Sequence, residues 1–197
     1  MPRVSQAEAK HNRVLIEDVS ATLFREKGLK VSVADVMAAA GLTHGGFYGH
    51  FASKDELIAI ACENAFKESA GRWRANADAV IGAGRKQSAL VENYLSLANI
   101  SNSGHGCPLA ALAADVAREG EDKPVRKAFC QGLEELVQIY CAGTHERSQA
   151  LAAISTLVGA LVLARANSGY AIAEELLTSA KNLLLKEIES SSETKCD

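Results

Sequence analysis

The segment GLTHGGFYGHF, residues 41–51, places four glycines between two stretches whose apolar residues recur with the helical period. A glycine inside a helix costs about 1 kcal/mol relative to alanine, so these glycines should interrupt an otherwise helical chain. We expect a short helix over residues 33–40, a glycine turn, and a second short helix over residues 43–50. Two short helices joined by a tight turn form a helix-turn-helix. Backbone that lacks Cβ atoms, as at Gly45 and Gly46, can approach another surface closely.

The rest of the chain shows the helical period almost throughout. Ser32 and Ser53 are placed to cap helix N-termini, Gly28 to end the first helix, and Pro108 to open a later one. No stretch alternates apolar and polar residues as a half-buried strand does. The sequence therefore predicts an all-α fold of about nine helices, with an N-terminal three-helix helix-turn-helix unit and a larger helical bundle. The later helices are expected to include residues 87–100, 125–141, 148–167 and 171–189.

The composition bears on partners and cellular compartment. The net charge is −3, so any basic footprint for nucleic acid has to be local. Five cysteines, an odd number without a CxxC pair, favour a reducing cytosol over a disulfide framework. The polar N-terminus lacks the apolar stretch of a signal peptide. The uncharged run over residues 148–164 is shorter than the ~20 residues that a membrane span needs, so we expect a buried helix there.

The sequence lacks the common motifs of catalysis. There is no P-loop, no GxSxG nucleophile turn, no HExxH and no Rossmann glycine pattern. His105 with Cys107, and Cys141 with His145, are closely spaced, but neither pair makes a full set of metal ligands. We therefore expect no enzyme, no cofactor and no metal site.

The stretch VSVADVMAAAGLTHGGFYGHFASKDEL, residues 31–57, resembles the DNA-binding motif of the TetR family of transcriptional regulators. The shared pattern is a glycine turn, a Ser or Thr, two small residues, an aromatic-x-x-Phe, then Ser-Lys and two acidic residues. The resemblance implies a cytoplasmic, sequence-specific DNA-binding regulator, a homodimer that represses from a palindromic operator until a small-molecule or electrophile signal releases it. It implies a DNA-binding domain over residues 1–52 and an effector-binding and dimerisation domain over residues 53–190. Met37 and Gly49 depart from the family pattern, so this pattern does not define the operator sequence that the chain would bind.

A helix-turn-helix places its second helix in the major groove of DNA. Phe47 and Phe51 are four residues apart and should anchor this helix to its neighbours. Residues 1–57 hold as many acidic as basic side chains, so phosphate contacts depend on a few well-placed cations, expected to be Arg3, Lys10, Arg13, Lys30 and Lys54. For each polar candidate the alternative is packing or simple solvation. The residues expected to contact DNA are Ser32, Thr43, His44, Gly45, Gly46, Tyr48, His50 and Lys54.

A single short helix reads only a few base pairs, so specific recognition favours a two-fold dimer on two half-sites. The last two expected helices are apolar over more than one face, and in the TetR family such helices pair as a four-helix bundle. The alternative is that these faces pack only within their own chain. The expected interface residues are Leu157, Leu161, Ala164, Leu176, Leu177, Ala180 and Leu184.

Cys107 follows a loop rich in glycine and serine and directly precedes Pro108, at an expected helix start. Thiolates are stabilised at helix N-termini, and His105 can add positive charge, so one interpretation is a thiol sensor of oxidants or electrophiles. The other is a small buried residue that fills space. Certain electrophile-responsive members of the family carry a cysteine at what looks like this helix start.

The effector itself remains open at the level of sequence. The large residues available to line a pocket are Phe66, Trp73, Tyr94, Phe129 and Tyr140, and core packing is the alternative for each. An alternative function for the whole chain is a helix-turn-helix scaffold that binds a protein partner without affinity for an operator.

Overall fold

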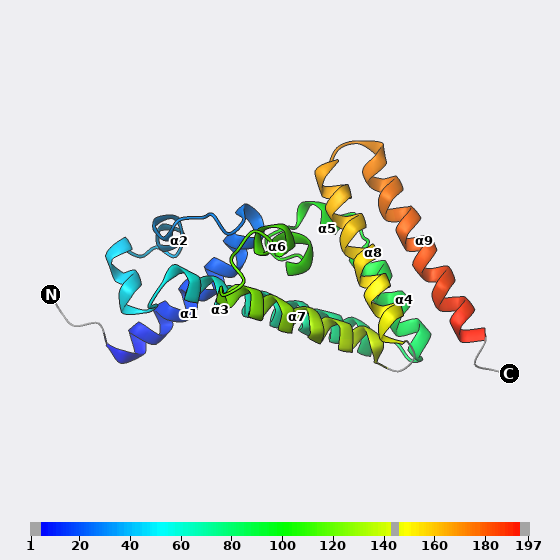
Figure 1. Ribbon diagram of the computed structural model, residues 1–197, viewed down its shortest axis with the longest axis horizontal. Coiled ribbons are helices and arrows are strands. Elements are labelled where there is room, and N and C mark those ends of the chain that lie inside the picture. Colours follow the sequence, from blue (N-terminus) through cyan, green and yellow to red (C-terminus); the bar gives the residue numbers. More distant parts are fainter. Residues whose placement is uncertain (1–4, 143–145, 194–197) are drawn as a thin grey trace.

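The computed structural model describes residues 5–142 and 146–193, and within these ranges the chain consists of helices joined by turns and loops (Figure 1). The prediction of an all-α fold is confirmed. In chain order the elements are α1 (Gln6–Lys27), α2 (Val33–Ala39), the 3-10 helix η1 (His44–Gly49), α3 (Lys54–Asp78), α4 (Ala83–Tyr94), α5 (Ala98–Ser101), α6 (Pro108–Val116), α7 (Pro124–Cys141), α8 (Arg147–Ala166) and α9 (Ala171–Glu193).

Local sequence sets the ends of the first helices, as predicted. Ser32 forms a capping box with Asp35 at the start of α2: each side chain accepts a hydrogen bond from the other residue's backbone amide. The Ser53 hydroxyl caps α3 by accepting from the amide of Glu56 at 3.1 Å. Gly28 ends α1 with a φ of 79°, a conformation that glycine adopts without strain.

The long helix α3 joins the two halves of the molecule. It packs against α1 of the N-terminal unit and runs beside α7 of the C-terminal bundle (Figure 1). Leu57, Phe66 and Trp73 are among its buried residues. At the contact with α7, the ring of Phe66 lies over Gly132, where any side chain would collide with it. Because α3 contributes to both cores, a displacement in one half can reach the other.

The helices α8 and α9 form an antiparallel pair at the end of the molecule opposite the N-terminal unit (Figure 1). Among the described helices, α8 alone is long and apolar enough to cross a membrane, judged by length and composition. One face of it, from Ala150 to Ala164, is buried at helical spacing. We therefore interpret α8 as a core helix, in line with the expectation from the sequence.

Two expected helices differ in detail from the structure. Residues 44–49 form a 3-10 helix rather than an α-helix, because three of the six residues are glycines with little preference for the α-helix. The expected helix over residues 87–100 is divided into α4 and α5. The Asn99 side-chain amide donates to the carbonyls of Asn93 at 2.8 Å and Tyr94 at 3.0 Å, which satisfies the end of α4.

Replacing Gly132 with alanine should lower the free energy of unfolding by about 1–3 kcal/mol, because the new methyl group would overlap the packed Phe66 ring. Thermal or denaturant unfolding measures this change. Gly71→Ala is the matched control, since Gly71 is also helical and no described atom beyond its own helix lies within 4 Å of the position of a Cβ. Equal effects of the two substitutions would contradict the packing of Phe66 on Gly132.

Candidate nucleic-acid interface

Two phenylalanines hold η1 onto the N-terminal unit. Phe47 is 0% exposed and Phe51 is 2% exposed. Their rings stack with centroids 5.5 Å apart, and Met37 of α2 is buried in the same core. Both rings are therefore anchors, as their spacing in the sequence predicts, and they fix which side of η1 faces outward.

The outer side of η1 carries few side chains. Gly45 and Gly49 have no described neighbour within 4 Å of the position that a Cβ would occupy, while at Gly46 the nearest described atom is 3.7 Å away. Tyr48 projects outward and is 71% exposed. Exposed backbone beside one projecting phenol is a surface that can come close to a groove. Among the residues expected to contact DNA, those exposed on or beside η1 are Thr43, His44, Gly45, Gly46 and Tyr48.

Arg13, expected from the sequence to contact phosphate, has internal partners instead. Its guanidinium donates to the carbonyl of His50 and forms ion pairs with Glu17 at 3.0 Å and with Glu56 at 3.4 Å. It also lies 4.4 Å from the centroid of the Phe51 ring, in cation–π geometry. Arg13 therefore ties α1 to the end of η1 and the start of α3. The sequence could not show the contacts with His50 and Glu56, because these residues lie 37 and 43 positions away along the chain.

Ser32 and Lys54 also have partners within the chain. The Ser32 hydroxyl bonds to the carboxylate of Asp35 at 2.6 Å, and hydrogen bonds from Ser32 lower the pKa of Asp35. The Lys54 ammonium donates to the carbonyl of Leu29 at 2.9 Å. An ammonium has three donors, so Lys54 can still reach a phosphate. The expected phosphate contacts that are exposed are Lys10 and Lys30, whereas Arg3 lies outside the described residues.

A second region, at the start of α6, brings together several residues expected to sense an effector. Cys107 is 6% exposed and shares a cavity of about 40 Å³ with Trp73, Tyr94 and His105. Among the described groups, the Tyr94 hydroxyl is buried without a hydrogen-bond partner. Burial, together with the neighbouring Cys107 thiol, raises the pKa of Tyr94 well above its ordinary value. Arg165 lies close to both groups, and burial lowers its pKa.

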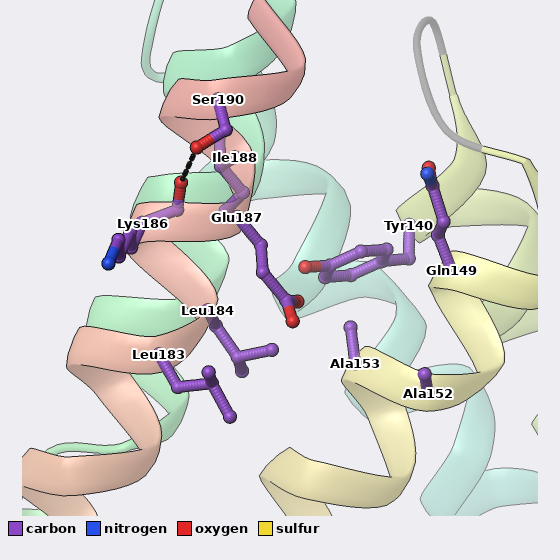
Figure 2. Close-up of a pocket in the computed structure, with 10 residues that line it drawn as sticks. All are labelled: Tyr140, Gln149, Ala152, Ala153, Leu183, Leu184, Lys186, Glu187, Ile188 and Ser190. Atoms are coloured by element: carbon purple, nitrogen blue, oxygen red, sulfur yellow. Dashed lines mark hydrogen bonds between the residues drawn. The ribbon is translucent and has the colours of Figure 1, made fainter.

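The other expected effector residues lie elsewhere. Phe66 and Phe129 meet edge to face, with centroids 5.3 Å apart. Tyr140 borders a cavity of about 570 Å³ between α8 and α9, and the side chain of Glu187 points toward it from α9 (Figure 2). Burial and the Glu187 carboxylate raise the pKa of Tyr140 to about 12. The sequence did not indicate Glu187, because only the packing of α9 in the assembled fold brings its side chain close to Tyr140 of α7.

The described parts of the chain, 5–142 and 146–193, contain no group of three His, Cys, Asp or Glu side chains able to hold a metal ion. His105 and Cys107 line the same small cavity, but no third ligand joins them. His145, considered from the sequence as a partner of Cys141, lies outside the described residues. The groups that line the cavity beside Cys107 include a thiol and an imidazole.

The residues expected at a dimer interface need correction. Five of them are at most 3% exposed and pack within their own chain: Leu157, Leu161, Ala164, Leu177 and Leu184. Leu176 and Ala180 are half-buried. A helical period identifies an apolar stripe but not the neighbour that covers it. The large apolar side chains that α8 and α9 expose are different ones, between 39% and 52% exposed: Leu151, Val162, Leu163, Ile172 and Leu183.

Comparison with known proteins finds a family match in the N-terminal part of the chain. Residues 16–60 match the family described as bacterial regulatory proteins, tetR family. The HTH-type transcriptional repressor KstR2 of Rhodococcus jostii (strain RHA1) is 35% identical over 63 residues, which cover 32% of this chain and 31% of that repressor. The aligned segment thus spans about a third of that relative.

Solved structures share the fold over most of the chain. A TetR transcriptional regulator from Chloroflexus aurantiacus J-10-FL superposes with a TM-score of 0.76 at 23% identity, over 93% of this chain and 97% of that one. The reduced form of NemR from E. coli superposes with a TM-score of 0.71 at 19% identity, over 87% and 96% of the two chains. At these identities the likeness concerns the fold.

Truncating the two neighbouring aromatic residues of η1 should lower stability by very different amounts. Phe47→Ala should lower the free energy of unfolding by about 3–5 kcal/mol, because it leaves a cavity at a fully buried ring. Tyr48→Ala should lower it by no more than about 1 kcal/mol, because that ring is 71% exposed and loses mainly its edge contact with Phe47. Denaturant unfolding measures both values. A reversed order would show that the inner and outer sides of η1 are assigned wrongly.

Proposed function

We propose that the chain is a member of the TetR family of bacterial regulatory proteins, which its matches support, and that two copies of it bind a palindromic DNA operator and repress transcription. Residues 1–52 form the DNA-binding domain in this proposal, and residues 53–190 form the effector-binding and dimerisation domain. The protein acts in the cytoplasm, where its cysteines stay reduced.

The outer side of η1 is the observation that carries the proposal. Its backbone is uncovered at Gly45 and Gly49, and Tyr48 projects from it, while Phe47 on the inner side is fully buried. A surface with so few side chains contributes little to the stability of a monomer, so we attribute the outer side of η1 to binding. Entry of the tip into a major groove brings backbone amides and the Tyr48 hydroxyl to phosphates and base edges.

The cations around η1 position the domain on DNA. Lys10 and Lys30 are exposed, and Lys54 has two donors left beyond its bond to Leu29. Point charges of this kind bind phosphates without reading sequence. The expected residues Ser32 and His50 have a smaller part, since the Ser32 hydroxyl is engaged in the capping box of α2.

The exposed apolar side chains of α8 and α9 provide the partner surface. Leu151 and Val162 on α8, and Ile172 and Leu183 on α9, are each at least 39% exposed. On α8, Gly159 has no described neighbour within 4 Å of a Cβ position, which lets another helix approach closely. A two-fold pairing of this surface places two copies of η1 on two half-sites of one duplex.

The releasing signal is a small molecule or an electrophile that reaches the cavity beside Cys107. The cavity measures about 40 Å³ and holds no more than a few water molecules, so a larger group must displace its walls. The buried hydroxyl of Tyr94 and the side chain of His105 offer polar contacts there. The thiolate form of a cysteine is the one that attacks electron-poor carbon.

DNA from upstream of the gene should bind two chains per operator, with an affinity that falls as salt rises. Lys30→Gln should reduce the slope of log K against log salt by about 0.9, because one phosphate contact is lost. Tyr48→Ala should weaken binding about tenfold, as expected for the loss of one good contact. Fluorescence anisotropy at several salt concentrations measures both effects.

Lys67→Gln is the control for charge, because Lys67 is an exposed lysine further along α3 with 69% of its side chain accessible. It should leave the slope unchanged. A folded wild-type chain that binds neither this DNA nor duplexes selected from a random library would favour the alternative function, a scaffold for a protein partner.

N-ethylmaleimide, a thiol-selective electrophile, should release the wild-type protein from operator DNA and should leave Cys107→Ser bound. The physical reason is that an adduct on Cys107 exceeds the volume of its cavity. Cys130→Ser is the control, since Cys130 is an exposed thiol that reacts without filling a cavity, and this variant should be released like the wild type. Equal release of Cys107→Ser and wild type would exclude Cys107 as the sensing thiol.

A further inference from the structure

Arg25 of α1 is a cation of the N-terminal unit, buried where the two halves of the chain meet. Its side chain is 1% exposed. Its N–H groups donate to the carboxylate of Glu68 at 2.8 Å, to the carbonyl of Gly106 at 3.3 Å and to the carbonyl of Ala21 at 3.0 Å. Burial acts to raise the pKa of Glu68, but hydrogen bonds and charge from Arg25 and Arg72 outweigh it and lower that pKa. Losing a partner of a buried charge is costly, so these contacts fix Arg25 firmly.

The loop before α6, residues 102–107, is held between α1 and α8. The Arg165 guanidinium of α8 donates to the carbonyls of Asn99 at 2.9 Å and Asn102 at 3.4 Å. At Gly106 a Cβ would lie 2.5 Å from Nη2 of Arg165 and 2.6 Å from the carbonyl oxygen of Asn102. At Gly104 a Cβ would collide with a side chain of α1. The loop therefore packs tightly between α1 and α8. A displacement of either helix must also displace the loop.

The same loop forms one wall of the cavity beside Cys107. Gly106 and Cys107 both line that cavity, together with Tyr94, whose buried hydroxyl lies near the Cys107 thiol. The peptide group that joins Gly106 to Cys107 carries the carbonyl that Arg25 holds. A group that enters the cavity or attaches to the sulfur therefore acts on a peptide already tied to the N-terminal unit.

A second tie lies at the other end of α6. The carboxylate of Asp115 accepts a hydrogen bond from the amide of Leu29 at 3.0 Å, in the turn between α1 and α2. The carbonyl of that same Leu29 accepts from Lys54 at the start of α3. The helix α6 thus links two regions. Its first residue adjoins the cavity, and its last turn contacts the N-terminal unit.

We propose that Arg25 and the Gly106 carbonyl form a latch that reports the state of the Cys107 cavity to the DNA-binding domain. With the carbonyl in place, Arg25 holds α1 in its operator-binding position. Displacement of the loop withdraws the carbonyl and lets α1 shift. Arg25 is therefore a positioning residue and does not touch DNA. The inference rests on the proposed function, because its biological output is operator affinity.

Gly106→Ala in the full-length chain tests the latch, because the added methyl group would collide with Nη2 of Arg165 and with the carbonyl oxygen of Asn102, and so forces the loop to rearrange. The dissociation constant for the operator should rise about tenfold or more, within the usual range of coupling between sites. The backbone amides of residues 22–28, in the last turns of α1, should exchange faster with deuterium. Gly71→Ala is the matched control, since no described atom beyond its own helix lies within 4 Å of its Cβ position, and it should change neither quantity.

A double-mutant cycle with Arg25→Met separates the latch from a general loss of stability. In the Arg25→Met background, Gly106→Ala should weaken operator binding by less than about threefold, because the connection is already broken. Equal fold losses in both backgrounds, or wild-type affinity in Gly106→Ala, would overturn the latch. If Arg25→Met does not fold, Arg25→Lys keeps the charge but not the forked geometry and takes its place.

The exchange measurement needs no DNA. If the wild-type chain binds no operator, the proposed function fails, while the comparison of Gly106→Ala with Gly71→Ala still decides the latch. Unchanged exchange in residues 22–28 of a folded Gly106→Ala protein would overturn it.

Discussion

The stack of Phe47 on Phe51, with the Arg13 guanidinium over the second ring, is the contact on which the presentation of η1 depends. A six-residue 3-10 helix with three glycines has no independent stability, so tertiary contacts must hold it. Burial of the two rings provides those contacts from one side only. The other side can then carry few side chains, which is the property that close approach to a duplex requires.

The loop before α6 contacts several of the regions to which we assign a function. Arg165 reaches it from α8, the helix that carries part of the proposed partner surface, and Arg25 reaches it from α1. Cys107 follows it directly and lines the small cavity. A change of a few tenths of an ångström in this loop therefore acts on three regions at once, because the packing at Gly106 leaves no space to absorb it.

The sequence predicted the helix ends correctly, because these depend on contacts between residues that are close along the chain. Ser32, Ser53 and Gly28 set helix ends through bonds to residues a few positions away, so their roles were visible in the sequence and the structure confirms them. The position of the helix-turn-helix followed from its glycines and from its resemblance to a known family. The burial of Phe47 and Phe51 followed from their spacing.

Features that depend on long-range packing could not be predicted. Arg13 and Arg25 look like any other surface cation in the sequence, yet the partners that fix them lie 37 to 81 residues away. The stripe of α8 that includes Leu157 was assigned to a partner subunit, although the chain buries it internally. A helical period defines faces, whereas only the assembled fold decides what each face meets.

The central claim is that the outer side of η1 enters a groove of duplex DNA. Hydrogen–deuterium exchange of residues 43–50, with and without a saturating operator duplex, tests it most directly. The account predicts strong protection of these amides in the complex, with little change in α7 at the far side of α3. Protection that appears elsewhere on the saturated protein while residues 43–50 exchange as they do without DNA would contradict it.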